Sequence, residues 1–453
     1  MLAPETLALA EAKVPRYTSY PTAPHFAPSV GAAHVHRWLG AIDDAKRVSV
    51  YAHVPFCKQL CWYCGCNTSI ASRYEPVHHF LEVLLREIAQ ARRIAGRRLR
   101  AGHVHLGGGT PNALSAADFG ALAHALRAAF RFDAETQFDV ELDPRTLDPA
   151  MIAALKEAGV TRVNLGIQDF APDVQRAINR EQPFELVADK LAALRAAGIA
   201  RVGMDLLYGL PHQTEESLRA TIDQVAELGA ERVALFGYAH VPWMKPHQKL
   251  LEPEGLPGTA ARWALATAAH VRLAERGYER VGIDHFAYPD DEIAVARREG
   301  RLRRNFQGYT TDAADTLIGF GPSAISAFAQ GYAQNHTRLD DWRRAVEAGD
   351  PPVARGTALD DEDRLRRAAI ERLMCDLELD LDALCRRFGV EGGAAAHFEA
   401  EFARLARMQA EGLVRVEGAV LRVPESARAF VRVVASVFDA YLEPGHAKHS
   451  VAV

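Results

Sequence analysis

Four of the six cysteines lie close together, in the segment Cys57-Lys-Gln-Leu-Cys61-Trp-Tyr-Cys64-Gly-Cys66. Three thiolates from one loop can hold a four-iron cubane and leave its fourth iron without a protein ligand. A catalytic metal site needs such an open position, because a reacting molecule must bind there. The spacing of Cys57, Cys61 and Cys64 therefore favours a [4Fe–4S] cluster that binds a small molecule.

A structural zinc ion held by all four thiolates is the alternative. Zinc pairs are usually separated by about two to four residues, whereas Cys64 and Cys66 are separated by one. A disulfide framework would spread its cysteines along a small secreted chain, so this clustering in a long chain indicates metal or redox chemistry. Cys375 and Cys385 lie in an amphipathic stretch, and we expect them in the core.

The cysteine cluster follows the first of several β-rich, almost wholly apolar runs, which alternate with helical stretches. These runs occupy residues 48–57, 103–111, 137–144, 162–170, 201–210 and 232–240. Strands buried on both faces have this composition, and Gly159 and Gly198 mark helix ends before the next run. The pattern predicts an α/β fold: six parallel strands with crossover helices, which close or partly close into a TIM-like (β/α)6 barrel.

Polar residues stand at the end of every predicted strand, where βα barrels gather their chemistry. They are Cys57, Gly107, Gly108, Gly109, Thr110, Glu141, Asp143, Gln168, Asp169, Asp205, Tyr208, Tyr238 and His240. The three glycines allow close approach of a ligand, with a tight turn as the alternative. They do not form G-x-G-x-x-G, so a dinucleotide site is disfavoured. For His53 and His240 we expect ordinary hydrogen bonding.

Composition divides the chain into three parts. We expect a Pro- and aromatic-rich arm at 1–47, the barrel with a C-terminal extension at 48–345, and a mainly helical domain at 346–453 that ends in a small hairpin at 412–423. The net charge of -5 and the pI of about 6.4 disfavour a nucleic-acid partner. Without a basic start before an apolar run or a stretch of ~18 apolar residues, we expect a cytoplasmic protein with no membrane span.

The CxxxCxxC spacing at the end of a first barrel strand resembles that of the radical S-adenosylmethionine superfamily. Over nearly the whole chain, from about residue 14, the sequence resembles one family within it, the oxygen-independent coproporphyrinogen III oxidases. The segments that carry this resemblance are VPRYTSYPTAPHF, HVPFCKQLCWYCGCNT, VELDPR, GIQDF, VQRAINREQ, MDLLYGLPHQT, FGYAHVP, GIDHFAYPDDEIAVARREGRLRRNFQGYTT and GFGPSAIS.

The resemblance implies one [4Fe–4S] cluster per chain, with Cys57, Cys61 and Cys64 as its ligands and Cys66 as a nearby non-ligand. It implies that the cluster cleaves S-adenosylmethionine to a 5′-deoxyadenosyl radical, and that two S-adenosylmethionine molecules bind. Their implied contacts are Tyr51, Tyr63, Gly108, Gly109, Thr110, Glu141, Gln168, Arg180, Asp205, Ala239 and Ile325. For Cys66 the structural alternative is a small buried residue.

The implied reaction, a step of porphyrin and haem biosynthesis, converts two propionate side chains of coproporphyrinogen III to vinyl groups and gives protoporphyrinogen IX. A substrate with four carboxylates needs cationic partners, and Arg16, Arg303 and Arg304 lie in matching segments. The alternative for each arginine is a solvated surface position.

We further expect a monomer that takes electrons from a donor such as a flavodoxin or ferredoxin. A haem chaperone, or another haem-binding protein built on the same radical framework, is the alternative function. Such relatives lack the tyrosine-rich arm and the NFQGYTT-like segment, both of which this chain has, so the enzyme is favoured.

Overall fold

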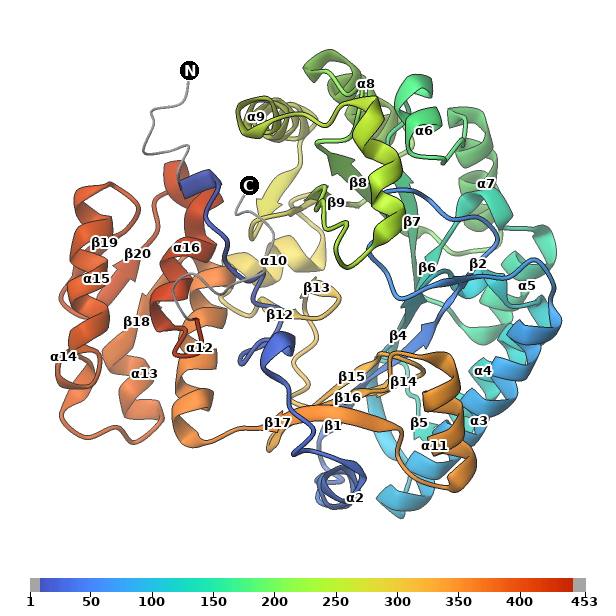
Figure 1. The fold of residues 1–453 in the computed structure, drawn as a ribbon, viewed down its shortest axis with the longest axis horizontal. Helices are drawn as coiled ribbons and strands as arrows, with labels where there is room; N and C mark the ends of the chain where they lie inside the picture. Colours follow the sequence, from blue (N-terminus) through green and yellow to red (C-terminus); the bar gives the residue numbers. More distant parts are fainter. Residues whose placement is uncertain (1–8, 443–453) are drawn as a thin grey trace.

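The computed structural model describes residues 9–442, and a sheet of thirteen strands dominates it (Figure 1). Neighbouring strands run parallel in the order β9-β8-β7-β6-β4-β1-β14. Their bounds are β1 Arg47–Val54, β4 Leu99–Gly108, β6 Gln137–Leu142, β7 Arg162–Gln168, β8 Arg201–Tyr208, β9 Arg232–Gly237 and β14 Leu317–Phe320. The six predicted parallel strands are confirmed, and β14 adds one beyond β1.

Both ends of the sheet continue in short strands. On one side β11 and β10 are antiparallel to β9 and to each other, and on the other side β15, β16 and β17 follow β14 antiparallel. Their bounds are β10 Glu279–Val281, β11 His285–Ala287, β15 Ile325–Phe328, β16 Gly331–Asn335 and β17 Val353–Ala358, and β5 Phe130–Arg131 pairs with β4. Because β10 and β17 end the strand order, the barrel is partial, as predicted.

Helices connect the parallel strands and cover the convex side of the sheet (Figure 1). They are α3 Glu75–Ala95, α4 Ala116–Ala129, α5 Pro149–Ala158, α6 Pro172–Ala177, α7 Phe184–Ala196, α8 Glu215–Glu227 and α9 Thr259–Glu275. Three more helices flank the sheet, namely α2 Ala32–Gly40, α10 Glu292–Arg298 and α11 Leu339–Ala348. Within residues 9–442, no helix is both long and apolar enough to cross a membrane.

Local sequence sets the limits of these helices, as α5 illustrates. The Asp148 side chain accepts a hydrogen bond from the Met151 backbone N–H, and Pro149 occupies the first turn, where its missing donor costs nothing. Gly159 ends the helix at φ 74°, a left-handed conformation that glycine adopts without steric cost. The glycine signal in the sequence therefore located the helix end correctly.

Apolar side chains of the central strands and the surrounding helices form the main hydrophobic core. Val50, Val104, Val140 and Leu165, one from each of four adjacent strands, are at most 1% exposed. Each such buried side chain contributes on the order of 1.5–3 kcal/mol to folding. The core therefore fixes the strand ends, which carry the polar residues.

Helices with a small three-stranded sheet form a separate C-terminal unit, beside the barrel in Figure 1. Its elements are α12 Asp361–Asp376, α13 Leu381–Arg387, α14 Gly393–His397, α15 Glu399–Ala410, α16 Val431–Ala435, β18 Glu378–Asp380, β19 Arg415–Glu417 and β20 Val420–Arg422. β19 and β20 form the predicted hairpin. Cys385 packs into the core of this unit and Cys375 into a small neighbouring cluster, so both are buried as expected.

The N-terminal segment runs between the two units (Figure 1) and belongs to the core of the C-terminal one. Tyr17 and Tyr20 are at most 5% exposed, and the Tyr17 hydroxyl donates a hydrogen bond to the Asp439 carboxylate at 2.9 Å. The Tyr20 hydroxyl accepts one from the Ala440 backbone N–H at 3.1 Å. This arm therefore joins the beginning of the described chain to its end.

The boundary before the C-terminal domain was expected after residue 345. Strand β17 still belongs to the main sheet through its pairing with β16, whereas α12 contributes to the C-terminal core. We therefore propose a boundary between β17 and α12. A division into arm, barrel and C-terminal domain remains our proposal.

Candidate active site

The cysteine segment follows β1 and is held from one side by the strand ends around it. Two short strands, β2 Phe56–Cys57 and β3 Ser69–Ile70, close the base of the loop. The backbone N–H of Gly109 donates to the Val54 carbonyl at 2.8 Å, and that of Thr110 donates to the Phe56 carbonyl at 2.9 Å. The end of β4 therefore anchors the start of the cysteine loop.

From the other side, three side chains hold the backbone carbonyls of the loop. Asn179 donates to the Leu60 carbonyl at 2.8 Å, and Gln248 donates to the Tyr63 carbonyl at 2.9 Å. The His247 ring nitrogen Nε2 lies 2.8 Å from the Cys64 carbonyl. Asn179 follows α6, and the other two lie in the 3-10 helix η4 Pro246–Glu254. Our sequence analysis missed all three, because these bonds join segments more than 100 residues apart.

Two guanidinium groups contact the sulfur of Cys61. Arg145 Nη2 and Arg180 Nη1 each lie 3.4 Å from Cys61 Sγ, and both arginines also contact the Asp143 carboxylate, at 2.7 and 3.5 Å. The Thr68 hydroxyl lies 3.4 Å from Cys57 Sγ. Cations and donors beside sulfur stabilise thiolates and a negatively charged cluster. Arg180 was predicted, and Arg145 lies in the VELDPR segment without having been singled out.

The positions of the sulfur atoms bear on the zinc alternative. A zinc ion with Zn–S bonds of ~2.3 Å would bring its thiolate sulfurs to about 3.8 Å from one another. Among residues 9–442, only His103, His105 and Asp139 form a group of three such side chains whose ligand atoms lie within 4.8 Å of one another. In this structure the cysteine sulfurs are therefore not gathered as closely as one zinc ion would hold them.

Cys66 is exposed, so the alternative of a small buried residue is wrong. Its backbone N–H lies 3.4 Å from Cys64 Sγ. The pKa of the Cys64 thiol falls to about 6, because the Cys66 thiol donates to it and because Lys245 and His247 add positive charge, although burial opposes the shift. Cys66 thus supports Cys64 in its thiolate form while its own side chain faces the adjoining cavity.

A cavity of about 460 Å³ occupies the interior of the barrel beside Cys66. We call it the central cavity. Four of the predicted S-adenosylmethionine contacts line it, namely Tyr51, Glu141, Asp205 and Ile325. The structure therefore brings together residues from four strands that are far apart in the sequence. For Glu141 and Asp205 this agrees with their predicted places at strand ends.

Histidines connect two of these residues to the rest of the barrel. The Tyr51 hydroxyl lies 3.0 Å from His53 Nδ1, and the other His53 nitrogen lies 2.7 Å from the Asn67 carbonyl. His105 Nε2 lies 2.9 Å from the Glu141 carboxylate. Burial alone would raise the pKa of Glu141, but the hydrogen bond and charge of His105 lower it. Glu141 therefore offers a carboxylate to the cavity.

Asp205 behaves differently from Glu141, although both line the same cavity. Burial and then the negative charge of Glu141 raise the pKa of Asp205 to about 7, although the charge of Arg180 opposes the shift. Near neutral pH its carboxyl group therefore exists in both protonation states. A neutral carboxyl can donate a hydrogen bond, for example to a ribose hydroxyl, whereas its carboxylate only accepts.

The three glycines at the end of β4 make room for the protein itself. A Cβ atom on Gly109 would lie 2.5 Å from the Phe56 carbonyl oxygen, and one on Gly107 would lie 2.6 Å from Glu141 Oε2. The backbone N–H of Gly108 is engaged as well, at 3.3 Å from the Glu141 carboxylate. The close approach of the cysteine loop and of Glu141 thus requires glycine at Gly109 and Gly107, and contact of Gly108 and Gly109 with S-adenosylmethionine stays a prediction.

Other predicted contacts lie outside the central cavity. Thr110 is buried, where its hydroxyl bonds to Asn112 and accepts from the Asp143 backbone N–H. Gln168 has a φ of 70°, a conformation that a non-glycine residue adopts at a cost and that is common at binding sites. Tyr63 follows Trp62 in the cysteine loop and packs beside α6. These residues surround the loop rather than the barrel interior.

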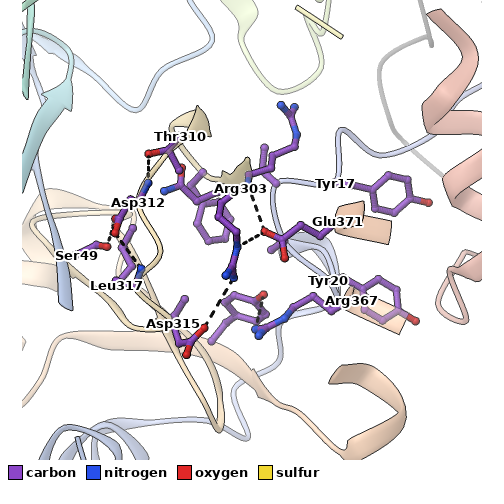
Figure 2. Close-up of a pocket in the computed structure, with 18 of the residues that line it drawn as sticks. Tyr17, Tyr20, Ser49, Arg303, Thr310, Asp312, Asp315, Leu317, Arg367 and Glu371 are labelled. Atoms are coloured by element: carbon purple, nitrogen blue, oxygen red, sulfur yellow. Dashed lines mark hydrogen bonds and ion pairs between the residues drawn. The ribbon is translucent and has the colours of Figure 1, made fainter. Parts of the chain in front are cut away.

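Among the three predicted substrate arginines, Arg303 and Arg304 are bonded within the protein. Figure 2 shows Arg303 between Glu371, at 2.8 Å, and Asp315, at 3.9 Å. Arg304 is buried, with its guanidinium group 4.4 Å from the centre of the Tyr309 ring and 3.8 Å from Asp284. Neither is the solvated surface residue that we considered as the alternative.

The backbone carbonyl of Arg16 accepts hydrogen bonds from Arg304 at 3.3 Å, and Arg16 lines a second cavity of about 170 Å³. Its guanidinium group donates to the Gly237 carbonyl at the end of β9, at 3.3 Å. Ala239, the remaining predicted S-adenosylmethionine contact, lines the same cavity. The predicted contacts are therefore distributed over two adjacent cavities and the cysteine loop.

The chain matches known proteins over almost its full length. Two family models match it, the Radical SAM superfamily at residues 51–225 and the HemN C-terminal domain at residues 359–430. It is 45% identical to an oxygen-independent coproporphyrinogen III oxidase of Bradyrhizobium diazoefficiens, with 98% of each chain covered. For the Escherichia coli protein of that name the identity is 37%, with 94% of this chain and 93% of the relative covered.

A solved structure agrees with these relatives. The coproporphyrinogen III oxidase HemN from Escherichia coli, described as a radical SAM enzyme, superimposes with a TM-score of 0.89 at 35% identity. The match covers 95% of this chain and 100% of the HemN chain. Sequence and structure thus agree from the cysteine loop to the C-terminal unit, and the chain belongs to the oxygen-independent coproporphyrinogen III oxidase family of the radical S-adenosylmethionine superfamily.

Proposed function

We propose that this protein converts two propionate side chains of coproporphyrinogen III to vinyl groups, without oxygen and by radical chemistry. The observation that carries the proposal is the position of the cysteine loop, which opens onto a cavity of about 460 Å³ lined by Tyr51, Glu141, Asp205 and Ile325. The full-length similarity to coproporphyrinogen III oxidases supports this substrate.

The residues of the loop fit a [4Fe–4S] cluster, with Cys57, Cys61 and Cys64 as its ligands. When bound, the cluster and S-adenosylmethionine supply the radical that takes a hydrogen atom from the β-carbon of a propionate, after which CO2 and one electron leave. Arg145 and Arg180 hold positive charge against Cys61 and stabilise the cluster. Trp62 and Tyr63 keep water from the loop, which packs against α6.

We propose two S-adenosylmethionine positions. The predicted contacts fall into two sets that support this number. Tyr51, Glu141, Asp205 and Ile325 line the central cavity, whereas Tyr63 and Arg180 lie at the cysteine loop. Glu141 would accept hydrogen bonds as a carboxylate, and Asp205 would exchange a proton near neutral pH. Equilibrium dialysis of the cluster-loaded protein would count the bound molecules.

The electron donor, the oligomeric state and the location of the protein are inferred from the sequence. We propose that an electron donor such as a flavodoxin or ferredoxin reduces the cluster, and that the protein acts as a monomer. A cytoplasmic location stays a prediction. Size-exclusion chromatography with light scattering would measure the oligomeric state, and anaerobic turnover with each donor in place of a chemical reductant would identify the donor.

Anaerobic turnover tests the proposed function. Protein reconstituted with iron and sulfide should contain about four irons per chain. With coproporphyrinogen III, S-adenosylmethionine and a reductant it should form protoporphyrinogen IX, detected by chromatography after oxidation to the porphyrin. Stoichiometric haem binding without vinyl formation would instead support the haem chaperone.

Cys61→Ala should lose the cluster and all S-adenosylmethionine cleavage, because Cys61 is a proposed cluster ligand that is buried beside Arg145 and Arg180. Iron analysis and 5′-deoxyadenosine formation measure both losses. Cys385→Ala is the matched control, because this cysteine is buried in the C-terminal unit, and it should keep its iron. A Cys61→Ala protein that still cleaves S-adenosylmethionine would show that the ligand set is wrong.

A further inference from the structure

The second cavity lies where the barrel meets the C-terminal unit, and arginines from four separate segments line it. Arg16 comes from the arm, Arg262 from α9, Arg280 from β10 and Arg432 from α16. We call this cavity of about 170 Å³ the arginine cavity. Phe236 lines both this cavity and the central cavity, so the two are adjacent.

Within residues 9–442, Arg262 and Arg280 have no carboxylate within 4 Å to balance their charge. The Nε atom of each is buried and has no hydrogen-bond partner in this part of the chain. Arg280 does donate to the Ile283 carbonyl at 3.0 Å, and Arg262 lies over the Tyr208 ring at 5.7 Å from its centre. Both contacts orient a guanidinium group without neutralising it.

The acids of the arginine cavity serve other cations. Asp284 lies 2.7 Å from His285 Nδ1 and 3.8 Å from Arg304, and Glu425 lies 2.6 Å from Arg428. Neither Asp284 nor Glu425 forms an ion pair with Arg262 or Arg280. The guanidinium groups of Arg262 and Arg280 thus have no ion-pair partner among residues 9–442.

Titration behaviour agrees with a crowding of positive charge. Burial and then the charge of Arg428 lower the pKa of Arg280 to about 10, although the charges of Glu425 and Asp284 oppose the shift. For His270, which also lines the cavity, burial and then the charge of Arg280 lower the pKa to about 3. Buried cations that repel one another cost stability, and a protein retains them where an anion binds.

We propose that the arginine cavity binds the carboxylate of a propionate side chain that the reaction leaves intact; this inference rests on the proposed function. At about 170 Å³ the cavity is smaller than the ~300–1,000 Å³ that enclose a whole drug-sized ligand, so it suits a side chain and not the macrocycle. Guanidinium groups bind carboxylates through paired hydrogen bonds, and Arg262 and Arg280 have donors to spare.

The positions of the two cavities determine the orientation of the bound macrocycle. Cys66, at the end of the cysteine loop, borders the central cavity but not the arginine cavity. A propionate next to the loop therefore reacts, while another propionate of the same macrocycle reaches past Phe236 to the arginines. Two of the four propionates remain after the reaction, so such an anchor serves both substrate and product.

The carboxylate of S-adenosylmethionine is the other source of the same chemistry, because Ala239 lines the arginine cavity. The experiment distinguishes the propionate from the S-adenosylmethionine carboxylate. It measures the affinity for a porphyrin and the affinity for S-adenosylmethionine on the cluster-loaded full chain. Its variants are Arg262→Met and Arg280→Met, which keep the length of the side chain and remove the charge. Arg415→Ala, an exposed arginine on β19, is the matched control.

Fluorescence titration should show coproporphyrin III binding at least tenfold more weakly to each variant than to the wild type or to Arg415→Ala. Mesoporphyrin IX, which keeps only the two propionates that do not react, should lose affinity by the same factor. S-adenosylmethionine affinity and uncoupled cleavage should be unchanged. Thermal stability should stay equal or rise, because a repelled buried cation is removed, whereas a purely structural arginine would lower it.

Each contrary result has a definite meaning. Unchanged coproporphyrin affinity in both variants, with normal wild-type turnover, would overturn this inference alone. Loss of coproporphyrin but not of mesoporphyrin affinity would assign the arginines to a reacting propionate and overturn it too. Weaker S-adenosylmethionine binding with unchanged porphyrin binding would assign them to the methionine carboxylate. A loaded wild type without any turnover would overturn the proposed function itself.

Discussion

At the scale of single residues, Gly109 shows how closely the cysteine loop packs on the strand beneath it. The backbone N–H of Gly109 bonds to Val54, and a Cβ atom there would lie 2.5 Å from both the Phe56 carbonyl and the Thr68 hydroxyl. The Thr68 hydroxyl in turn contacts Cys57 Sγ. This glycine therefore positions a predicted cluster ligand indirectly.

Gly109→Ala should destabilise the protein by about 1–3 kcal/mol, because the added methyl group overlaps backbone that cannot move aside. Denaturant unfolding measures the loss, and iron content after reconstitution should fall with it. Gly65→Ala is the control, since Gly65 lies in the same loop with no atom within 4 Å of its would-be Cβ. Equal stability of the two variants would contradict the close packing described here.

At the scale of elements, one buried carboxyl group joins the helix α3 to three other segments. Glu87 accepts hydrogen bonds from the Gly321 backbone N–H at 2.8 Å, from Asn335 at 2.8 Å and from Trp342 at 3.0 Å. Burial raises its pKa to about 7 despite these three donors. The contact fixes α3 against β16, α11 and the turn after β14.

Glu87→Gln should destabilise the protein by about 1–3 kcal/mol, because its amide N–H2 would face buried donors. The pKa of Glu87 is higher in the folded state than in the unfolded state, so its contribution to stability is greatest below pH 4.5 and declines as pH rises to about 7. The difference between wild type and variant should therefore shrink over that range.

Urea unfolding at several pH values between 4.5 and 7.5 measures this difference directly. Glu75→Gln, at the exposed start of the same helix, is the control and should show no such trend. A difference that grows with pH would mean that Glu87 is charged in the folded protein, contrary to the direction of its pKa.

At the scale of the whole molecule, the arm connects the barrel side of the protein to the C-terminal unit. Tyr17 bonds to Asp439, while the neighbouring Arg16 lines the arginine cavity and bonds to the end of β9. Burial raises the pKa of Tyr17 far above its usual value, and the charge of Asp439 raises it further, so the hydroxyl keeps its proton. The stability of the arm and the shape of the arginine cavity are thus linked.

Tyr17→Phe should cost about 1.5–3 kcal/mol, the usual contribution of a hydrogen bond to a charged group, and should loosen the arm. Hydrogen exchange of the segment around residues 13–22 measures that loosening. Tyr441→Phe is the control, because its bond to Asp363 lies at a more exposed position and should matter less. Unchanged exchange in Tyr17→Phe would show that packing alone holds the arm.

Much of this architecture could be predicted, but not the partners of the predicted residues. The parallel strands were found because buried strands read as continuous apolar runs, and their ends located Glu141 and Asp205 at one cavity. The packing of the cysteine loop and of Glu141 against the glycines was not predicted, because a sequence does not tell which segments of the chain approach them. Arg303 and Arg304 turned out to be bonded inside the protein for the same reason.

What the sequence by itself determined is local: the spacing of Cys57, Cys61 and Cys64, the strand periodicity and the helix caps all act within a few residues. Tertiary structure alone decided which charges meet. It brought Arg145 and Arg180 to Cys61, and it joined Arg262 and Arg280 to the arm and α16 around one cavity. Electrostatic contacts depend on distance in space, and folding sets that distance between segments far apart in the chain.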